Sequence, residues 1–322
     1  FPTTVNPIII NNLVPVFVDA SLPTYNIDVN LIERAISEKT KAIAIAHTLG
    51  NPFDLEKVKN ICDKYNLYLI EDCCDALGSK YKNKHVGTFG DIGTLSFYPA
   101  HHITMGEGGA VFCSSSKIKR VLDSIRDWGR DCWCDTGCDN TCKKRFEWKL
   151  GELPKGYDHK YIYTNLGYNF KITEMQAALG LAQLGKLEAF INIRRENYSL
   201  LLNLLEDLKE YLILPEKTSY SYPSWFGFPL TIKEDDRFSK REIIIFLEEK
   251  GIATRPIFAG NIVRQPYMRS VNYKKVNDLK VSDRIMEKSF WLGLYPGLNK
   301  DHIQYISRII HNYFKKGFIE AN

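Results

Sequence analysis

Apolar and polar positions along this 322-residue chain follow a pattern typical of repeated strand–helix units. Short apolar runs predict strands, whereas apolar residues near a 3.6-residue period predict amphipathic helices. The predicted strands are Val14–Val18, Ala42–Ala46, Leu67–Ile70, Ile92–Phe97 and Ala110–Cys113, and the predicted helices are Leu31–Ile36 and Leu55–Tyr65. Because strands that alternate with helices build sheets covered on both faces, we expect an α/β fold with a mostly parallel sheet.

The C-terminal part of the chain predicts a second, smaller unit. A long helical stretch runs from Thr173 to about Leu212, and helical patterns recur at Ile243–Glu249 and Ile303–Phe314. The Tyr- and Pro-rich segment Tyr220–Pro229 begins an α+β region. Since 322 residues exceed the usual size of one hydrophobic core, we expect a large domain over residues 1–184 and a small C-terminal domain over residues 185–322.

Composition narrows the function classes. Hydrophobic residues make up 44% of the chain and charged residues 25%, values typical of globular proteins. The net charge of +5 is mild and no long basic run occurs, so we expect no nucleic acid and no membrane as partner. The apolar runs are too short to span a bilayer and no signal-peptide pattern is present, so we expect a cytoplasmic protein.

Two segments carry candidate chemistry. Glu71 and Asp72 end a predicted buried strand, where a carboxylate can open on a ligand crevice and pair with a protonated ring nitrogen. Later in the chain, His101 and His102 precede the glycine-rich run 106–109, which allows close approach of the backbone to a ligand. Taken alone, a solvated strand end and an ordinary loop with two solvated histidines explain these segments equally well.

Eight cysteines form a second constellation. Two of them, Cys73 and Cys74, adjoin Asp72. Four others crowd into eleven residues: Cys132, Cys134, Cys138 and Cys142. A disulfide knot is not expected, because nothing else in the chain is typical of a secreted protein. Clustered thiolates suit either structural zinc or a [2Fe–2S] cluster, and the chemistry of the residues alone leaves both open.

Two of these segments share a pattern with a known family. Residues 71–78 match E-D-x-x-x-A-x-G, and residues 96–109 match S-F followed by G-E-G-G. Together they resemble the DegT/DnrJ/EryC1/StrS sugar aminotransferases, a family of fold-type I pyridoxal phosphate enzymes. The resemblance implies an aspartate aminotransferase-like fold, with Asp72 at the cofactor's ring nitrogen. His101 occupies the position of the lysine that holds the cofactor covalently, and no lysine lies between Lys84 and Lys117. A transaminase is therefore not expected.

One branch of this family, a group of nucleotide-sugar 3-dehydrases, also replaces that lysine by histidine and binds a [2Fe–2S] cluster through the pattern C-x57-C-x-C-x7-C. In this chain 57 residues separate Cys74 from Cys132, one separates Cys132 from Cys134, and seven separate Cys134 from Cys142. The resemblance therefore implies a cysteine-rich iron–sulfur insertion near residues 130–145 with these four ligands. It excludes Cys73 and Cys138 as ligands.

The resemblance assigns roles to further residues. Asn169, in a segment that matches G-Y-N-x-x-x-T-E-x-Q, would reach the cofactor phosphate of the neighbouring subunit in a homodimer. Ser96 would also contact the cofactor phosphate. Residues that distinguish the branch and are expected near the cofactor are Asp75, Tyr98 and Phe226. Arg255 is a candidate for binding the substrate's diphosphate because guanidinium suits bidentate phosphate recognition, although a surface arginine explains it equally well.

The expected enzyme binds pyridoxamine 5'-phosphate (PMP/PLP) without a covalent link and removes the 3-hydroxyl of a CDP-4-keto-6-deoxyhexose, with His101 as the proton acceptor. An NADH-dependent flavin/iron–sulfur reductase would deliver electrons through the cluster, and the products would be 3,6-dideoxyhexoses of bacterial surface polysaccharide. The chain opens as the interior of the family's large domain does, so we expect an N-terminal part with a phosphate-binding loop to precede it. A cluster-free sugar 3-dehydratase and a zinc-bound inactive binding module stay open as alternatives.

Overall fold

The first sheet is mostly parallel, as predicted. In this computed structural model, which describes residues 1–135, 137–235 and 237–319, its strand order is β2-β3-β6-β7. The three strands β2 (Ala42–Ala46), β3 (Tyr68–Asp72) and β6 (Ile92–Ser96) are parallel, and β7 (Gly109–Cys113) is antiparallel to β6. The register pairs Asp72 with both Ala46 and Thr94, so the carboxyl ends of the parallel strands lie at one edge of the sheet.

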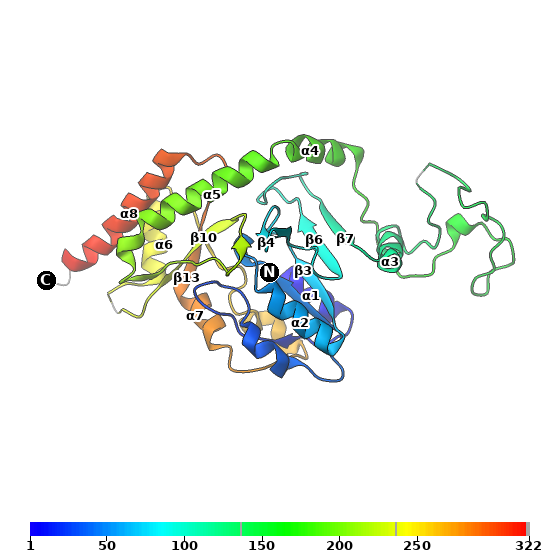
Figure 1. Cartoon of the computed structure of the whole chain (residues 1–322), viewed down its shortest axis with the longest axis horizontal. Helices are drawn as coiled ribbons and strands as arrows, with labels where there is room; N and C mark the ends of the chain where they lie inside the picture. Colours follow the sequence, from blue (N-terminus) through cyan, green and yellow to red (C-terminus); the bar gives the residue numbers. More distant parts are fainter. Residues whose placement is uncertain (136, 236, 320–322) are drawn as a thin grey trace.

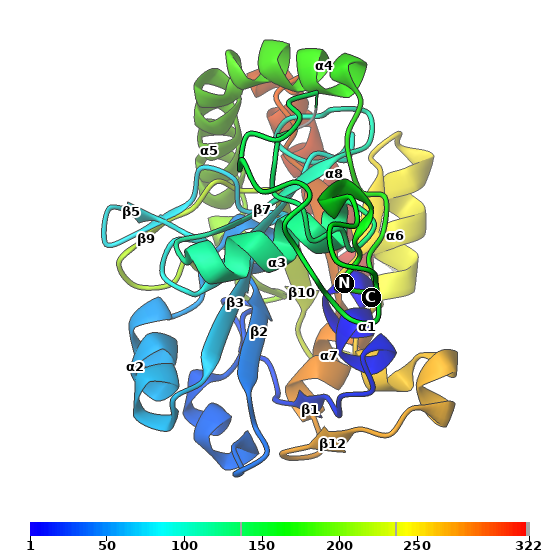
Figure 2. The ribbon, with the colours of Figure 1, turned by 90° about the vertical axis from the view of Figure 1, so that its right-hand side faces the viewer.

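Helices cover this sheet, and local sequence signals explain where they begin and end. Figure 2 shows α2 (Leu55–Tyr65) beside β3 and α1 (Pro2–Ile10) beside β2. The helix α2 begins after Asp54, whose carboxylate accepts a hydrogen bond from the Lys57 amide, and ends at Asn66 in the left-handed conformation. The predicted helix at Leu31–Ile36 is instead a 3₁₀ helix, Val29–Ala35. The helix α3 (Ser116–Arg126) follows β7.

A second, antiparallel sheet carries the C-terminal part of the chain. Its strand order is β11 (Thr254–Pro256), β13 (Ser289–Gly293), β10 (Gly227–Ile232) and β8 (Leu212–Ile213). The helices α5 (Leu187–Leu204), α6 (Lys240–Glu249) and α8 (Lys300–Ile319) lie with this sheet on one side of the molecule (Figure 1). Every residue of β10 is buried. The remaining elements are β1 (Val16–Phe17), β4 (Lys80–Tyr81), β5 (Lys84–His85), β9 (Ser221–Tyr222), β12 (Lys274–Lys275) and α7 (Lys280–Lys288).

The predicted single helical stretch from Thr173 to Leu212 is wrong, because the chain forms two helices there. The helix α4 (Glu174–Leu184) begins with a capping box between Thr173 and Gln176, and α5 (Leu187–Leu204) follows after a break at Gly185. Leu212 lies in β8. The domain boundary after Leu184 coincides with this break and stays a prediction. None of the described helices is long and apolar enough to span a membrane.

A small apolar cluster joins the two sheets. Its buried members come from both parts of the chain: Tyr25, Leu49, Phe226, Ile257 and Ile285. The Tyr25 hydroxyl lies 2.6 Å from the Thr231 hydroxyl of β10, a hydrogen bond between side chains 206 positions apart. This junction fixes Phe226 in place, and Phe226 forms part of the site described next.

Candidate active site

Asp72 lies at the edge where the parallel strands end. Its Oδ2 accepts a hydrogen bond from the Thr4 hydroxyl of α1 at 2.7 Å, and its Oδ1 accepts one from the Cys74 amide at 3.1 Å. Burial raises the pKa of this carboxyl, but the hydrogen bonds from Cys74 and Thr4 outweigh burial and hold the pKa below its ordinary value. Asp72 is therefore ionised near neutral pH, as a partner of a protonated ring nitrogen must be.

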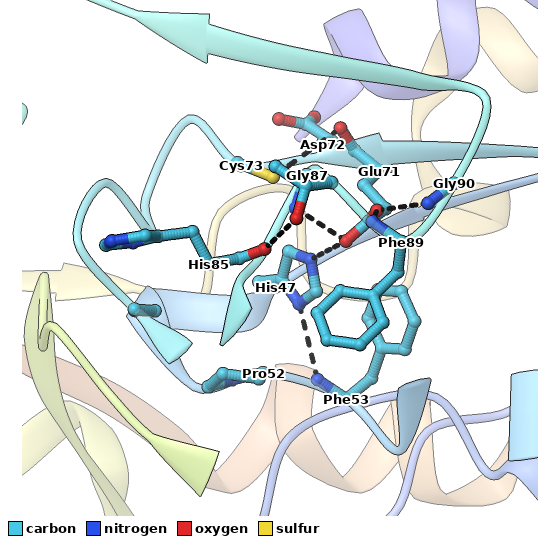
Figure 3. Close-up of polar contacts among 12 residues, drawn as sticks. His47, Pro52, Phe53, Glu71, Asp72, Cys73, His85, Gly87, Phe89 and Gly90 are labelled. Atoms are coloured by element: carbon cyan, nitrogen blue, oxygen red, sulfur yellow. Dashed lines mark hydrogen bonds and ion pairs between the residues drawn. The ribbon is translucent and has the colours of Figure 1, made fainter. Parts of the chain in front are cut away.

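Glu71, the residue before Asp72, anchors this edge from inside the molecule (Figure 3). Its carboxylate accepts hydrogen bonds at 2.6–2.8 Å from three backbone amides of the following loop, those of Gly87, Phe89 and Gly90. Its Oε2 also lies 3.2 Å from His47 Nε2. Within the described residues, Glu71, His47 and Cys73 are the one group of three potential metal ligands within 4.8 Å of one another. Because these hydrogen bonds occupy the carboxylate, we interpret the group as a structural anchor.

His101 lies beside Asp75, with its Nδ1 3.5 Å from Asp75 Oδ1, too far for a strong hydrogen bond. Burial, followed by the charge of Asp72, raises the pKa of Asp75 to about 7. Burial also lowers the pKa of His101, and the charge of Asp72 only partly offsets that effect. His101 is therefore mainly a neutral imidazole near pH 7, with a lone pair that can accept a proton.

Two aromatic residues predicted near the cofactor contact the His101 ring. Its centroid lies 5.1 Å from that of Phe226 and 6.4 Å from that of Tyr98. A cavity of about 610 Å³ opens beside His101, between the 99–104 loop, the helix α5 and the segment 291–297. The structure thus brings together His101, Asp75, Tyr98 and Phe226 from distant positions in the sequence. Of these four residues His101 and Phe226 line the cavity, whereas Asp75 and Tyr98 do not.

Three other predicted residues also lie outside the cavity lining. Ser96 ends β6, and its hydroxyl accepts a hydrogen bond from the Tyr98 amide at 3.2 Å. Asn169 is exposed and forms an isolated backbone bridge with Asp127, after α3. Arg255 is exposed on β11, where its Nη1 donates to the carbonyl oxygen of the preceding residue. The roles of all three residues stay predictions.

Three of the four predicted iron ligands lie in one exposed stretch, the cysteine-rich segment (residues 130–162), which projects beyond α3 in Figure 1. Hydrogen bonds, first from Thr141 and then from Cys142 and Cys132, lower the pKa of Cys134 to about 7. Cys74 instead lies next to Asp72, where burial and the Asp72 charge raise its pKa. Cys134 lies beside both Cys142 and Cys132, which hydrogen-bond to it, and the four-cysteine ligand set stays a prediction.

Sequence reasoning gave no role to two residues that line the same cavity. His102 is buried, and its Nε2 lies 3.1 Å from the Ser224 carbonyl oxygen. Arg194 of α5 is also buried, and its Nη1 donates to the carbonyl oxygens of Trp225 and Phe226 at 3.3 and 3.1 Å. The position of His102 next to His101 was a usable signal. Arg194 had none, because it lies in a helical pattern beside a second arginine.

Comparison with solved structures defines the class of fold. The chain is similar to a variant of GDP-4-keto-6-deoxymannose-3-dehydratase with bound GDP-perosamine, with a TM-score of 0.85 and 28% identity over 96% of this chain and 78% of that one. It is also similar to the Escherichia coli GDP-4-keto-6-deoxy-D-mannose-3-dehydratase with bound hydrated PLP, with a TM-score of 0.82 and 29% identity over 94% and 75% of the two chains. The expected PLP-dependent aminotransferase-like fold is confirmed.

Comparison of sequences gives the family. A family model matches residues 1–311, and the chain belongs to the DegT/DnrJ/EryC1/StrS aminotransferase family. It is 59% identical over 318 residues to the lipopolysaccharide biosynthesis protein RfbH of Salmonella typhimurium, covering 99% of this chain and 73% of that protein. It is 49% identical over 316 residues to the dTDP-4-dehydro-2,6-dideoxy-D-glucose 3-dehydratase of Saccharopolyspora spinosa, covering 98% and 68%.

Proposed function

We propose that this protein is a nucleotide-sugar 3-dehydrase of the CDP-6-deoxy-L-threo-D-glycero-4-hexulose type, which removes the 3-hydroxyl of a CDP-4-keto-6-deoxyhexose, and that it is not a transaminase. The observation that carries the proposal is the placement of His101. This residue replaces the family's lysine, lies on a cavity of about 610 Å³ and packs on Phe226 beside Asp75. The relatives named as 3-dehydratases support the same reaction.

The residues present fit pyridoxamine 5'-phosphate. The ionised Asp72 suits a protonated pyridine nitrogen, and Ser96 at the end of β6 is available to a phosphate. When bound, this cofactor supplies an amine for the sugar's keto group and an electron sink. In the loaded protein Asp72 would hold the proton on the ring nitrogen, and neutral His101 would accept a proton from the carbon that bears the amine. Phe226, Trp291 and the neutral His102 line the cavity and keep bulk water from the reacting atoms.

The direct test is elimination of a labelled hydroxyl. The protein, loaded with pyridoxamine 5'-phosphate, is incubated with CDP-4-keto-6-deoxyglucose that carries ¹⁸O at carbon 3, and with its GDP- and dTDP-linked counterparts. We expect loss of the label to water with the CDP sugar, because elimination requires no external electron donor. An amino sugar that retains the label would contradict the proposal, and faster loss from the GDP or dTDP sugar would contradict the substrate assignment.

We also propose that a [2Fe–2S] cluster is held by four cysteines: Cys74, Cys132, Cys134 and Cys142. An NADH-dependent flavin/iron–sulfur reductase would reduce this cluster. The spacing of the four cysteines supports it. We derive no electron-transfer step through it. A second candidate is a cluster-free 3-dehydratase, supported by the similarity of the fold to GDP-4-keto-6-deoxy-D-mannose-3-dehydratase with bound hydrated PLP.

Iron analysis separates the two candidates. About two irons and two sulfides per chain, with an electron paramagnetic resonance signal after dithionite reduction, would support the cluster. Cys74→Ser should then lose iron, whereas Cys138→Ser, the matched control from the cysteine-rich segment, should retain it. Zinc or no metal in anaerobically purified protein would favour the cluster-free enzyme.

We also propose a homodimer in the cytoplasm that serves O-antigen synthesis, as the name of the Salmonella relative suggests for that protein. Support for the dimer comes from α4, none of whose residues is buried although its sequence is largely apolar. Met175 is 81% exposed and Leu181 is 73% exposed. An exposed apolar helix face of this kind is typical of a protein–protein interface. Analytical ultracentrifugation should detect a dimer that Leu181→Glu weakens, and a monomer at micromolar concentration would contradict it.

A further inference from the structure

Arg194 of α5 is a buried cation that no carboxylate neutralises directly. Its side chain is 2% exposed, and its Nη1 donates to two carbonyl oxygens, those of Trp225 and Phe226. Its Nε is buried without a hydrogen-bond partner, and no salt bridge to Arg194 occurs in the described part of the chain. Since a buried charge is costly unless it is paired, this arrangement calls for a role beyond packing.

The position of Arg194 relates it to the reactive histidine. It lines the cavity together with His101 and His102, and its guanidinium carbon lies 6.0 Å from the centre of the Phe226 ring. The Phe226 ring also contacts the His101 ring, with the two ring centres 5.1 Å apart. The helix α5 therefore brings a positive charge to the wall of the cavity that holds the candidate proton acceptor.

The charged and titratable groups around His101 act in opposite directions. From the end of β3, Asp75 lies 3.5 Å away and the charge of Asp72 favours the protonated imidazole. From α5, Arg194 disfavours it, and burial acts in the same direction. The loop that carries His101 adds Tyr98 and the buried, neutral His102. Burial lowers the pKa of Arg194 itself only to about 10, so the guanidinium stays charged near pH 7. Arg194 is thus the cation that opposes the two carboxylates.

We propose that Arg194 is a positioning residue for the reaction: together with burial, which acts more strongly, its charge favours the neutral form of His101 that can accept a proton. This inference rests on the proposed function, which gives His101 that task. Arg194 could instead serve only as an anchor for the backbone of residues 225 and 226. That structural role predicts no effect on the protonation of His101, so an experiment can separate the two roles.

The structure offers a matched control on the same helix. Arg195 is half-buried, donates from Nε to the Pro223 carbonyl oxygen at 2.8 Å and stacks on the Tyr222 ring at 3.6 Å. It anchors the same segment of backbone but does not line the cavity. Arg195→Gln therefore removes a buried anchor and a charge next to Arg194 while leaving the proposed effect in place.

The test is a titration of the His101 imidazole by ¹⁵N nuclear magnetic resonance, with the signal assigned by its loss in His101→Asn. In Arg194→Gln we expect the midpoint to rise by about one pH unit, because removal of a cation stabilises the protonated ring. Arg194→Lys, which keeps the charge, and Arg195→Gln should leave the midpoint in place. Arg194→Met, whose unbranched side chain fills the same space, serves as the second neutral variant if the glutamine variant does not fold.

Enzyme kinetics then separate this inference from the function on which it rests. The acid limb of kcat/KM against pH should move upward in Arg194→Gln by the same amount as the imidazole midpoint, because protonated His101 cannot accept a proton. An unchanged midpoint, or an equal rise in Arg195→Gln, would overturn the role of Arg194. A risen midpoint with an unmoved acid limb would keep that role and contradict His101 as the proton acceptor.

Discussion

The cavity beside His101 and the cysteine-rich segment hold their chemical groups in opposite ways. At the cavity, His101, Phe226 and Arg194 come from three distant parts of the chain and meet inside packed structure. In the segment, three thiols come from eleven consecutive residues, and the described structure around them is small and largely exposed. A site built from distant residues is fixed by the fold, whereas a local set of thiols depends on the metal that it binds for its order.

The largest expected effect on activity is that of replacing His101. Replacement by asparagine should lower the rate of 3-hydroxyl elimination by about 10²–10⁴-fold, because a general base contributes about that much. Binding of pyridoxamine 5'-phosphate, followed by its absorbance, should persist. His85→Asn, which changes an exposed histidine on β5, is the control and should retain full activity. A loss of less than tenfold in His101→Asn would show that the packed cavity is not where the proton moves.

The second prediction concerns the anchor beneath Asp72. Glu71→Gln should lower the free energy of unfolding by about 2–4 kcal/mol, since it removes a buried charge that three amides and His47 stabilise. Urea unfolding measures the change. Glu33→Gln removes an exposed partner of Lys64 and should leave the free energy of unfolding almost unchanged, because solvent screens this pair. Equal losses in the two variants would contradict the view that buried local contacts fix the site.

The stability that Glu71 contributes with its partner His47 should depend on pH. Burial raises the pKa of Glu71, but His47 and the backbone amides outweigh it and hold the pKa below its ordinary value of 4.5. A carboxylate with a lowered pKa contributes stability that is present above pH 4.5 and is lost as the pH falls through the folded-state pKa. The difference between wild type and Glu71→Gln should therefore shrink on acidification below that value.

Features that depend on local sequence signals could be predicted, whereas features that depend on contacts between distant residues could not. The strand Ala42–Ala46 and the helix Leu55–Tyr65 have the bounds that periodicity and capping residues predict, because these signals are local. The placement of Arg194 depends on contacts with the backbone of Trp225 and Phe226, which no local pattern encodes. The break at Gly185 had a local signal, because glycine commonly ends a helix. His101 and Asp72 were found through family motifs, and the contact of Phe226 with His101 needed the fold.

Trypsin should cleave the cysteine-rich segment and the packed helix α2 at different rates. Lysines 143, 144, 149 and 155 are exposed in the cysteine-rich segment. Lys57 and Lys59 are also exposed, with side chains 58% and 42% accessible, but they lie in the packed helix α2. In metal-free protein, trypsin should cut the segment at least about tenfold faster than α2, as mass spectrometry can follow, because a protease needs locally opened backbone. Anaerobic loading with iron and sulfide should slow only the cuts in the segment. Equal rates at both places would remove the contrast.

The smallest expected effect concerns a buried contact group within the cysteine-rich segment itself. His159 is 1% exposed, its Nε2 lies 2.6 Å from Asp131 Oδ2, and its ring stacks on Trp148 at 4.8 Å. His159→Asn should accelerate tryptic cleavage of the segment several-fold, while the global free energy of unfolding changes by less than about 1 kcal/mol. The exposed His302→Asn of α8 is the control for both measurements. If His159→Asn destabilised the whole protein as strongly as Glu71→Gln does, the segment would belong to the same cooperative unit as the cavity, because coupled regions unfold together and independent ones do not.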